Sequence, residues 1–86
     1  MAVYLIDQQQ GPEALSIASL DAEAKVILIQ DGVYLDTESV ADKAVYAVAE
    51  DVKKRGLVDR LPKYVKIIDY GEVIDLVVAN KTVNFA

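Results

Sequence analysis

Short runs of apolar residues, separated by polar segments, divide this chain into alternating strands and helices. Five runs are rich in β-branched and other large apolar side chains, and they predict strands at residues 3–6, 25–29, 44–48, 65–68 and 81–85. The run at 25–29 is the clearest, because four apolar residues follow Lys25 without a polar break. Such continuity indicates a strand buried on both faces of a sheet. The last run is expected to form an edge strand.

Two segments between these runs predict short helices. Pro12 suits a first helical turn, because its missing N–H would be unpaired there, and it opens a helix over residues 12–20. Residues 50–56 place acidic residues first and basic residues last, which complements the helix dipole. Gly56 suits the left-handed position just after the last turn of that helix.

A third helix is predicted over residues 70–79. Asp69 and Glu72 have the spacing of a capping box at its start. Apolar residues cover nearly its whole circumference, so this helix is expected to pack against more than one surface: Val73, Ile74, Leu76, Val77 and Val78. By contrast, residues 33–42 predict an irregular stretch with one helical turn.

Strands that alternate with short helices predict an α/β fold with a mainly parallel sheet of four to five strands, joined by right-handed crossovers. A length of 86 residues fits a single domain spanning residues 1–86. Apolar residues make up 53% of this short chain. Two explanations remain open: an oligomer in which a second chain covers apolar surface, or a parallel sheet buried on both faces.

Charge limits the partners of this chain. The formal net charge of −5 argues against direct binding to nucleic acid, which needs a clustered basic surface. The nearest candidate is the basic run at residues 53–55, a single helical turn. No apolar run approaches the roughly 20 residues of a membrane span, and the first residues lack a basic region typical of a signal peptide. These features predict a cytoplasmic protein without membrane contact.

The sequence contains no cysteine and no histidine. A Ser/His/Asp triad and a conventional zinc site are therefore excluded for these residues. The four glycines are scattered, so no phosphate-binding loop is predicted. No segment has the dense oxygen ligands of a calcium loop. We therefore expect no catalytic residue, no metal site and no cofactor.

The polar segment Gln30-Asp31-Gly32, with Tyr34 just beyond it, is the candidate ligand or interface site. It leaves the carboxyl end of a buried strand, where ligands usually bind in open α/β sheets. The alternative is a tight turn in which Asp31 accepts nearby backbone N–H groups and Gly32 supplies a positive φ. Tyr34 fits either an interface aromatic or an ordinary, partly buried tyrosine.

The remaining acidic residues have structural explanations. Asp51 and Arg55 lie four residues apart and predict a surface ion pair along one helix. Asp69 is expected to cap a helix rather than to act as an acid catalyst. Asp75, on an otherwise apolar helix, either reaches solvent or pairs across a subunit contact.

Three segments, taken in order, resemble the DsrH/TusB family of sulfur-relay proteins within the DsrE-type fold group. They are residues 27–34, then residues 45–57 with Glu50-Asp51 and Arg55-Gly56, and finally residues 67–76 with Asp69-Tyr70. The resemblance implies a small three-layer α/β/α domain in a hetero-oligomer that passes persulfide sulfur along cysteines. Such a relay would serve thiolation of a tRNA wobble uridine or dissimilatory sulfur metabolism.

This chain differs from that family in three further features. Some members keep a cysteine in the first helix, at a position that falls near Ser16 here. A hydroxyl cannot replace a thiolate in persulfide chemistry, so the carrier role does not transfer. The segment between Tyr34 and Ala44 is also shorter than in many relatives, and Phe85 stands where a tryptophan is frequent.

These observations favour a non-catalytic DsrH/TusB-like subunit that scaffolds or regulates a sulfur-relay complex, together with cysteine-bearing subunits. The alternative is a homo-oligomeric binding module that has left sulfur relay. A third hypothesis is a small enzyme that acts through carboxylates, which would require an Asp or Glu with a raised pKa in a pocket.

Overall fold

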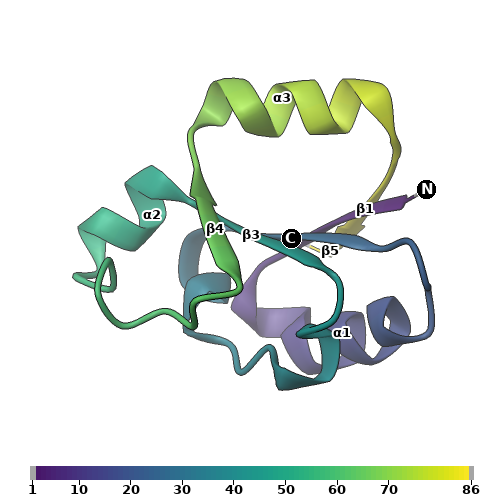
Figure 1. The fold of residues 1–86 in the computed structure, drawn as a ribbon, viewed down its shortest axis with the longest axis horizontal. Helices are drawn as coiled ribbons and strands as arrows, with labels where there is room; N and C mark the ends of the chain where they lie inside the picture. The colour runs from purple at the N-terminus through teal and green to yellow at the C-terminus, as the bar shows by residue number, and fades with distance from the viewer. Residues whose placement is uncertain (1, 86) are drawn as a thin grey trace.

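A five-stranded sheet forms the centre of the computed structural model, which describes residues 2–85 (Figure 1). All neighbouring strands are parallel, and the strand order is β4-β3-β2-β1-β5. The strands are β1 (Ala2–Ile6), β2 (Lys25–Leu28), β3 (Ala44–Val48), β4 (Val65–Ile68) and β5 (Lys81–Phe85). The predicted α/β class and parallel sheet are therefore confirmed, and β5 lies at an edge as expected.

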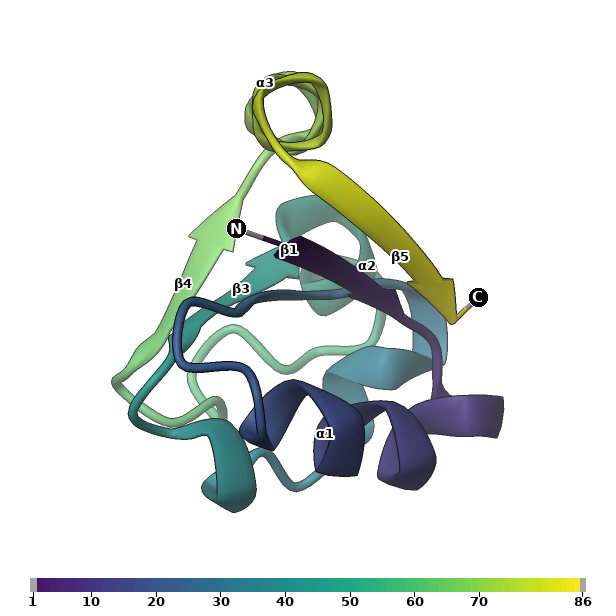
Figure 2. The same cartoon turned by 90° about the vertical axis from the view of Figure 1, so that its right-hand side faces the viewer.

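Helical segments cover both faces of this sheet. The α-helices are α1 (Gly11–Ser19), α2 (Ala49–Lys54) and α3 (Tyr70–Ala79), and short 3-10 helices are η1 (Gln8–Gln10), η2 (Gln30–Tyr34) and η3 (Glu38–Val40). Figure 2 shows α3 alone on one side of the sheet and α1 on the other side. This arrangement confirms the three-layer α/β/α architecture. None of the helices within residues 2–85 has the length and apolarity to cross a bilayer.

The predicted elements agree with the structure except near their ends. The helix predicted over residues 12–20 begins at Gly11 and ends at Ser19, and the one predicted over residues 50–56 is α2. Gly56 follows α2 with a φ of 67°, which confirms its left-handed position. The segment 33–42 contains the end of η2 and the whole of η3, where a single helical turn was expected.

Two hydrophobic cores of unequal size lie on the two faces of the sheet. The larger core, on the α1 face, joins residues from α1, α2, the 3-10 segments and every strand except β5: Tyr4, Ile6, Ala14, Leu15, Ala18, Ala24, Val26, Leu28, Val33, Val40, Val45, Ala47, Val52 and Val65. The smaller core contains the buried residues Val3, Ile27 and Val48, with Val73 and Leu76 of α3 packed against them. A single helix, α3, therefore covers one face of the sheet, whereas several segments together cover the other face.

Helix α3 contributes little buried surface of its own. Asp69 caps it, because the Asp69 Oδ1 atom accepts a hydrogen bond of 2.9 Å from the backbone N–H of Glu72. No residue of α3 is buried. The prediction that this helix packs against more than one surface is therefore wrong for the single chain, since the sheet is the one layer against which α3 packs.

Tyr4 joins the larger core to the loop after α1 and gives a test of the fold. Its ring stacks on Phe85, with ring centres 6.4 Å apart, and its hydroxyl donates a hydrogen bond of 3.1 Å to the Asp21 Oδ2 atom. Burial, followed by this hydrogen bond and the Asp21 charge, raises the pKa of the Tyr4 phenol. The folded state therefore favours the neutral phenol.

The contribution of the neutral Tyr4 phenol to stability is fully present below about pH 10, the usual pKa of tyrosine, and is lost as the pH rises through the higher folded pKa. In an alkaline titration followed by phenolate absorbance, we expect a late component that Tyr4→Phe reduces by one tyrosine. Tyr34→Phe, at an exposed tyrosine, serves as the control and should retain it. An unchanged titration curve in Tyr4→Phe would contradict this assignment.

Candidate functional site

The Asp31 loop, residues 30–34, lies at the carboxyl edge of the sheet. It forms η2, directly after β2. The backbone N–H of Ile29 donates to the Ile6 carbonyl at 3.0 Å, which holds the loop entrance against the end of β1. Because all strands are parallel, the ends of β1, β2 and β3 meet at this edge, where ligands bind in open α/β sheets.

The tight-turn explanation of this loop is wrong in its details. The residue with a positive φ is Gln30, at 50°, and not Gly32. Gly32 is required for a different reason: a Cβ atom there would lie 2.2 Å from the backbone oxygen of Ile6. Close approach of two backbone segments, rather than a left-handed conformation, explains this glycine.

Asp31 bonds to a distant side chain instead of to nearby backbone N–H groups. The Arg55 Nε atom donates a hydrogen bond of 2.8 Å to the Asp31 Oδ1 atom. The same guanidinium lies 3.4 Å from Asp51 Oδ1 and also donates to the Asp51 carbonyl at 3.2 Å. Arg55 therefore joins two carboxylates from two elements, the loop after β2 and helix α2.

The predicted pair between Asp51 and Arg55 exists, but it is not a surface pair. The Asp51 side chain is only 10% exposed, whereas that of Asp31 is 56% exposed. Among residues 2–85, Asp51 Oδ2 is the one buried side-chain oxygen or nitrogen that lacks a hydrogen-bond partner. Asp51 therefore depends on Arg55 for compensation of its charge.

The charges of Asp31, Asp51 and Arg55 affect the pKa values of groups in and near this cluster. The hydrogen bond from Arg55 to Asp31 is the largest cause that raises the pKa of Arg55, and the guanidinium therefore remains charged. The charge of Asp51, with burial and Glu50, raises the pKa of the Tyr70 phenol. Tyr34 is 52% exposed, which fits both explanations offered for it, the interface aromatic and the partly buried tyrosine.

Chain topology explains why Arg55 reaches Asp31. Strands β2 and β3 are neighbours and run in parallel, so the segments that follow them leave the same edge. Helix α2 begins directly after β3, and Arg55 lies just past its end. The contact between Arg55 and Asp31 was not predicted, because the pair with Asp51 already accounted for Arg55. The available signal was that each of two neighbouring strands is followed, three residues after its end, by an aspartate.

Replacing Arg55 should destabilise the protein more than replacing Asp31. In Arg55→Leu the buried Asp51 carboxylate loses its cation. In Asp31→Asn a neutral amide replaces a more exposed carboxylate, which weakens only a surface interaction. Urea denaturation followed by circular dichroism should give a clearly lower midpoint for Arg55→Leu and a nearly unchanged midpoint for Asp31→Asn. Equal midpoints in the two variants would contradict the dependence of Asp51 on Arg55.

The other residues singled out in the sequence lie apart from this cluster. Ser16 is exposed on α1, and among the described hydrogen bonds its carbonyl accepts only the Ser19 hydroxyl besides the bonds of the helix itself. Asp75 is exposed on α3, as the solvent explanation predicts for an isolated chain. No group of three or more acidic side chains in residues 2–85 is arranged to hold a metal ion.

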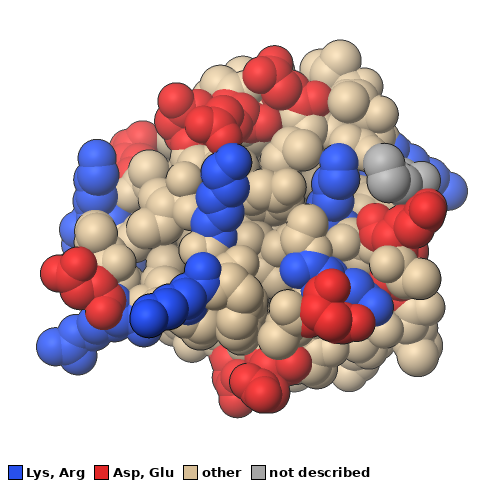
Figure 3. Space-filling model, viewed as in Figure 1, with Lys and Arg blue, Asp and Glu red and all other residues tan. Residues whose placement is uncertain are grey.

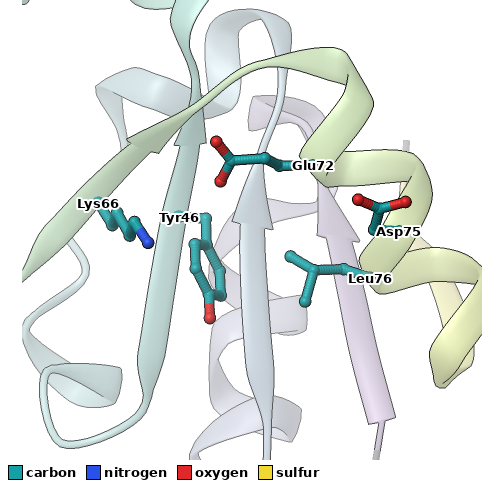
Figure 4. A pocket seen from close by; sticks show the side chains of 5 residues that line it. All are labelled: Tyr46, Lys66, Glu72, Asp75 and Leu76. Carbon is teal, nitrogen blue, oxygen red and sulfur yellow. The ribbon is translucent and has the colours of Figure 1, made fainter.

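A shallow hollow lies between α3 and the β3–β4 side of the sheet. It has a volume of about 250 Å³ and is lined by Tyr46, Lys66, Glu72, Asp75 and Leu76. Figure 4 shows the Tyr46 ring between Lys66 of β4 and Leu76 of α3, with the Glu72 carboxylate above the ring. No ion pair joins Lys66 to either acid within the described part of the chain. The sequence did not predict this hollow, because its residues come from three separate elements.

The fold and the carboxyl-edge cluster define a small, wholly parallel α/β/α domain without thiol or imidazole groups. The family model described as "DsrH like protein" matches residues 13–83 of this chain. The chain belongs to the DsrH-like family, which confirms the resemblance carried by the three segments. It is also similar to "Protein TusB" of Photorhabdus laumondii, with 36% identity over 61 residues. That match covers 62% of this chain and 64% of the relative, so it spans less than two thirds of the relative's length.

Proposed function

We propose that this protein is a non-catalytic subunit that scaffolds or regulates a sulfur-relay complex. Membership of the DsrH-like family supports the relay assignment, and the similarity to a protein named TusB favours a relay toward tRNA wobble-uridine thiolation over dissimilatory sulfur metabolism. The observation that carries the non-catalytic role is the absence of cysteine from the 86 residues. A relay needs a thiolate at each carrier position, and this chain offers none.

The surroundings of Ser16 also support a role without carrier chemistry. Ser16 stands near the position of the family cysteine, is exposed on α1, and has no histidine or cysteine anywhere in the sequence to activate it. The acidic residues of the carboxyl edge have structural partners: Asp31 and Asp51 pair with Arg55. The contribution of this chain to the relay is then binding and positioning of other subunits.

Cysteine-bearing DsrE-type relatives encoded in the same genome are the proposed partners. Their thiols must stay reduced between transfers, which fits assembly in the cytoplasm. No direct contact with tRNA is part of this proposal, because the chain carries a net charge of −5 and phosphate binding requires a basic surface.

Co-expression tests the proposal. A tagged form of this chain should co-purify with at least one cysteine-bearing relative and elute with it as one complex in size-exclusion chromatography. A matched co-expression with an unrelated acidic protein of similar size controls for non-specific association. If the chain elutes alone in every combination, the scaffold function is wrong. A stable homo-oligomer that binds none of the relatives would instead support the homo-oligomeric binding module.

A further inference from the structure

Helix α3 leaves most of its outer surface without a packing partner. Val73 and Leu76 pack against the smaller core, but none of the ten residues of the helix is buried. On the opposite side of the sheet, α1 has four buried residues. When only one side of an apolar helix is covered, its other side exposes apolar side chains that water solvates poorly.

The exposed apolar residues of α3 form one continuous stripe. Tyr70, Ile74 and Val78 follow one another at four-residue spacing, which places them along one line of the helix surface. They are 51%, 61% and 81% exposed, respectively. Isolated exposed apolar residues are common on proteins, but three in line over two turns of one helix are typical of an interaction surface.

Asp75, three residues before Val78, lies beside this stripe, and Glu72 lies further round the helix, at the edge of the hollow between α3 and the sheet. Glu72 and Asp75 are exposed, and neither forms an ion pair with any described residue. Helix α3 contains no lysine or arginine. Figure 3, in the orientation of Figure 1, shows Asp and Glu side chains gathered along the top of the molecule, over α3. We call the surface formed by Tyr70, Ile74, Val78, Glu72 and Asp75 the α3 outer face.

We infer that the α3 outer face binds a cysteine-bearing subunit through an apolar patch that is bordered by lysine or arginine residues. The apolar stripe supplies buried area, and the unpaired carboxylates supply electrostatic complementarity to a basic border. This inference rests on the proposed function and names the surface that the proposed complex would use.

A second copy of this chain fits the α3 outer face poorly. A two-fold symmetric contact joins the same patch on both copies, so it would bring together Glu72 and Asp75 of each chain. Like charges at a contact oppose association, and the net charge of −5 on each chain adds to that repulsion. A basic partner removes this repulsion and pairs both carboxylates.

The stripe is tested with the cysteine-bearing relative that co-purifies with the wild-type chain. Ile74→Lys and, separately, Val78→Lys should each weaken binding about tenfold or more in titration calorimetry, because a lysine would be buried without a partner at the contact. Ile17→Lys makes the same change on α1, on the opposite face of the sheet, at a residue that is 48% exposed. It should bind as the wild-type chain does. Circular dichroism verifies that every variant is folded.

The carboxylates are tested by salt dependence. The double variant Glu72→Gln/Asp75→Asn should bind more weakly at low ionic strength, and its affinity should change less with added salt than that of the wild-type chain. The control is Glu13→Gln on α1, an exposed acid far from the stripe. Affinity that responds to salt equally in the double variant and the wild-type chain would show that the basic border is wrong.

Each outcome has a definite meaning. Binding that survives both lysine substitutions in α3 overturns the α3 outer face and leaves the proposed function intact. Loss of binding in Ile17→Lys alone moves the interface to α1. Failure of the wild-type chain to bind any relative overturns the proposed function together with this inference. A wild-type homodimer that Ile74→Lys dissociates overturns the assignment of the partner.

Discussion

Gly32→Ala is expected to lower the free energy of unfolding by about 3 kcal/mol, at the upper end of the usual effect of overpacking. The added Cβ would lie 2.2 Å from the backbone oxygen of Ile6 and 3.2 Å from the Cα atom of Asp7. Both atoms belong to the backbone, so no side chain can rotate away to make room. Relief requires the end of β1 and the Asp31 loop to move apart, which strains the 3.0 Å hydrogen bond between Ile29 and Ile6. Urea denaturation measures the change.

Gly71→Ala is the matched control for this substitution. The Cβ added there would meet only the Asp69 Oδ1 atom, at 3.3 Å, and it would lie in the first turn of α3. Alanine is a better helix former than glycine, so the free energy of unfolding should stay within about 1 kcal/mol of the wild-type value. A Gly32→Ala variant as stable as Gly71→Ala would show that the loop does not pack against β1 as closely as described.

Ile27→Ala is expected to have the second large effect, a loss of about 2–5 kcal/mol. Ile27 is fully buried in the smaller core, where Val3 and Val48 are the other buried members. With so few residues beneath α3, removal of one large side chain opens a cavity that its neighbours cannot readily fill. The spread of the estimate reflects how far α3 can settle toward the sheet.

Ile74→Ala is the matched control for Ile27→Ala. Both variants replace isoleucine by alanine, so a difference in their free energies of unfolding reports the difference in burial. Ile74 is 61% exposed on the outer side of α3, so its replacement should change the free energy of unfolding by about 0.5 kcal/mol or less. Equal losses in Ile27→Ala and Ile74→Ala would contradict the placement of α3 with its Val73 and Leu76 side toward the sheet.

The strands were predictable because each is a short apolar run bounded by polar residues. Alternation of strands and helices then favoured a parallel sheet, and five parallel strands are present. Helix α3 was predicted over its full length, since Asp69 and Glu72 mark its start by a local hydrogen bond. Signals that act within a few residues are readable from sequence, and these elements depend on such signals.

The segment between β2 and β3 was less predictable because tertiary contacts determine its shape. Val33 and Val40 are buried in the larger core, and they hold η2 and η3 in place although neither segment has a strong helical pattern. The buried hydroxyl of Thr37 bonds with the Tyr64 hydroxyl at 2.8 Å across 27 residues of sequence. No periodicity in the segment itself encodes these partners.

The structure places the Asp31 loop where its position along the chain predicted, but the contacts of Asp31 and the role of Gly32 differ from those expected. Position at the end of a buried strand identified the Asp31 loop, and the structure places it at the carboxyl edge. The contact with Arg55 lies 24 residues away in sequence and depends on how β3 and α2 are placed. The role of Gly32 likewise depends on the distance to another strand, so sequence alone suggested a positive φ that belongs to Gln30.

In the proposed function, this chain assists sulfur transfer by binding other subunits and not by carrying sulfur. The most direct test of this function is the rate of transfer between cysteine-bearing subunits, measured from the mass of each chain over time with and without this protein. We expect transfer to slow when the chain is omitted, with the added sulfur found on the partners' cysteines and none on this chain. An unchanged rate without the chain, or sulfur bound to the chain itself, would contradict the claim.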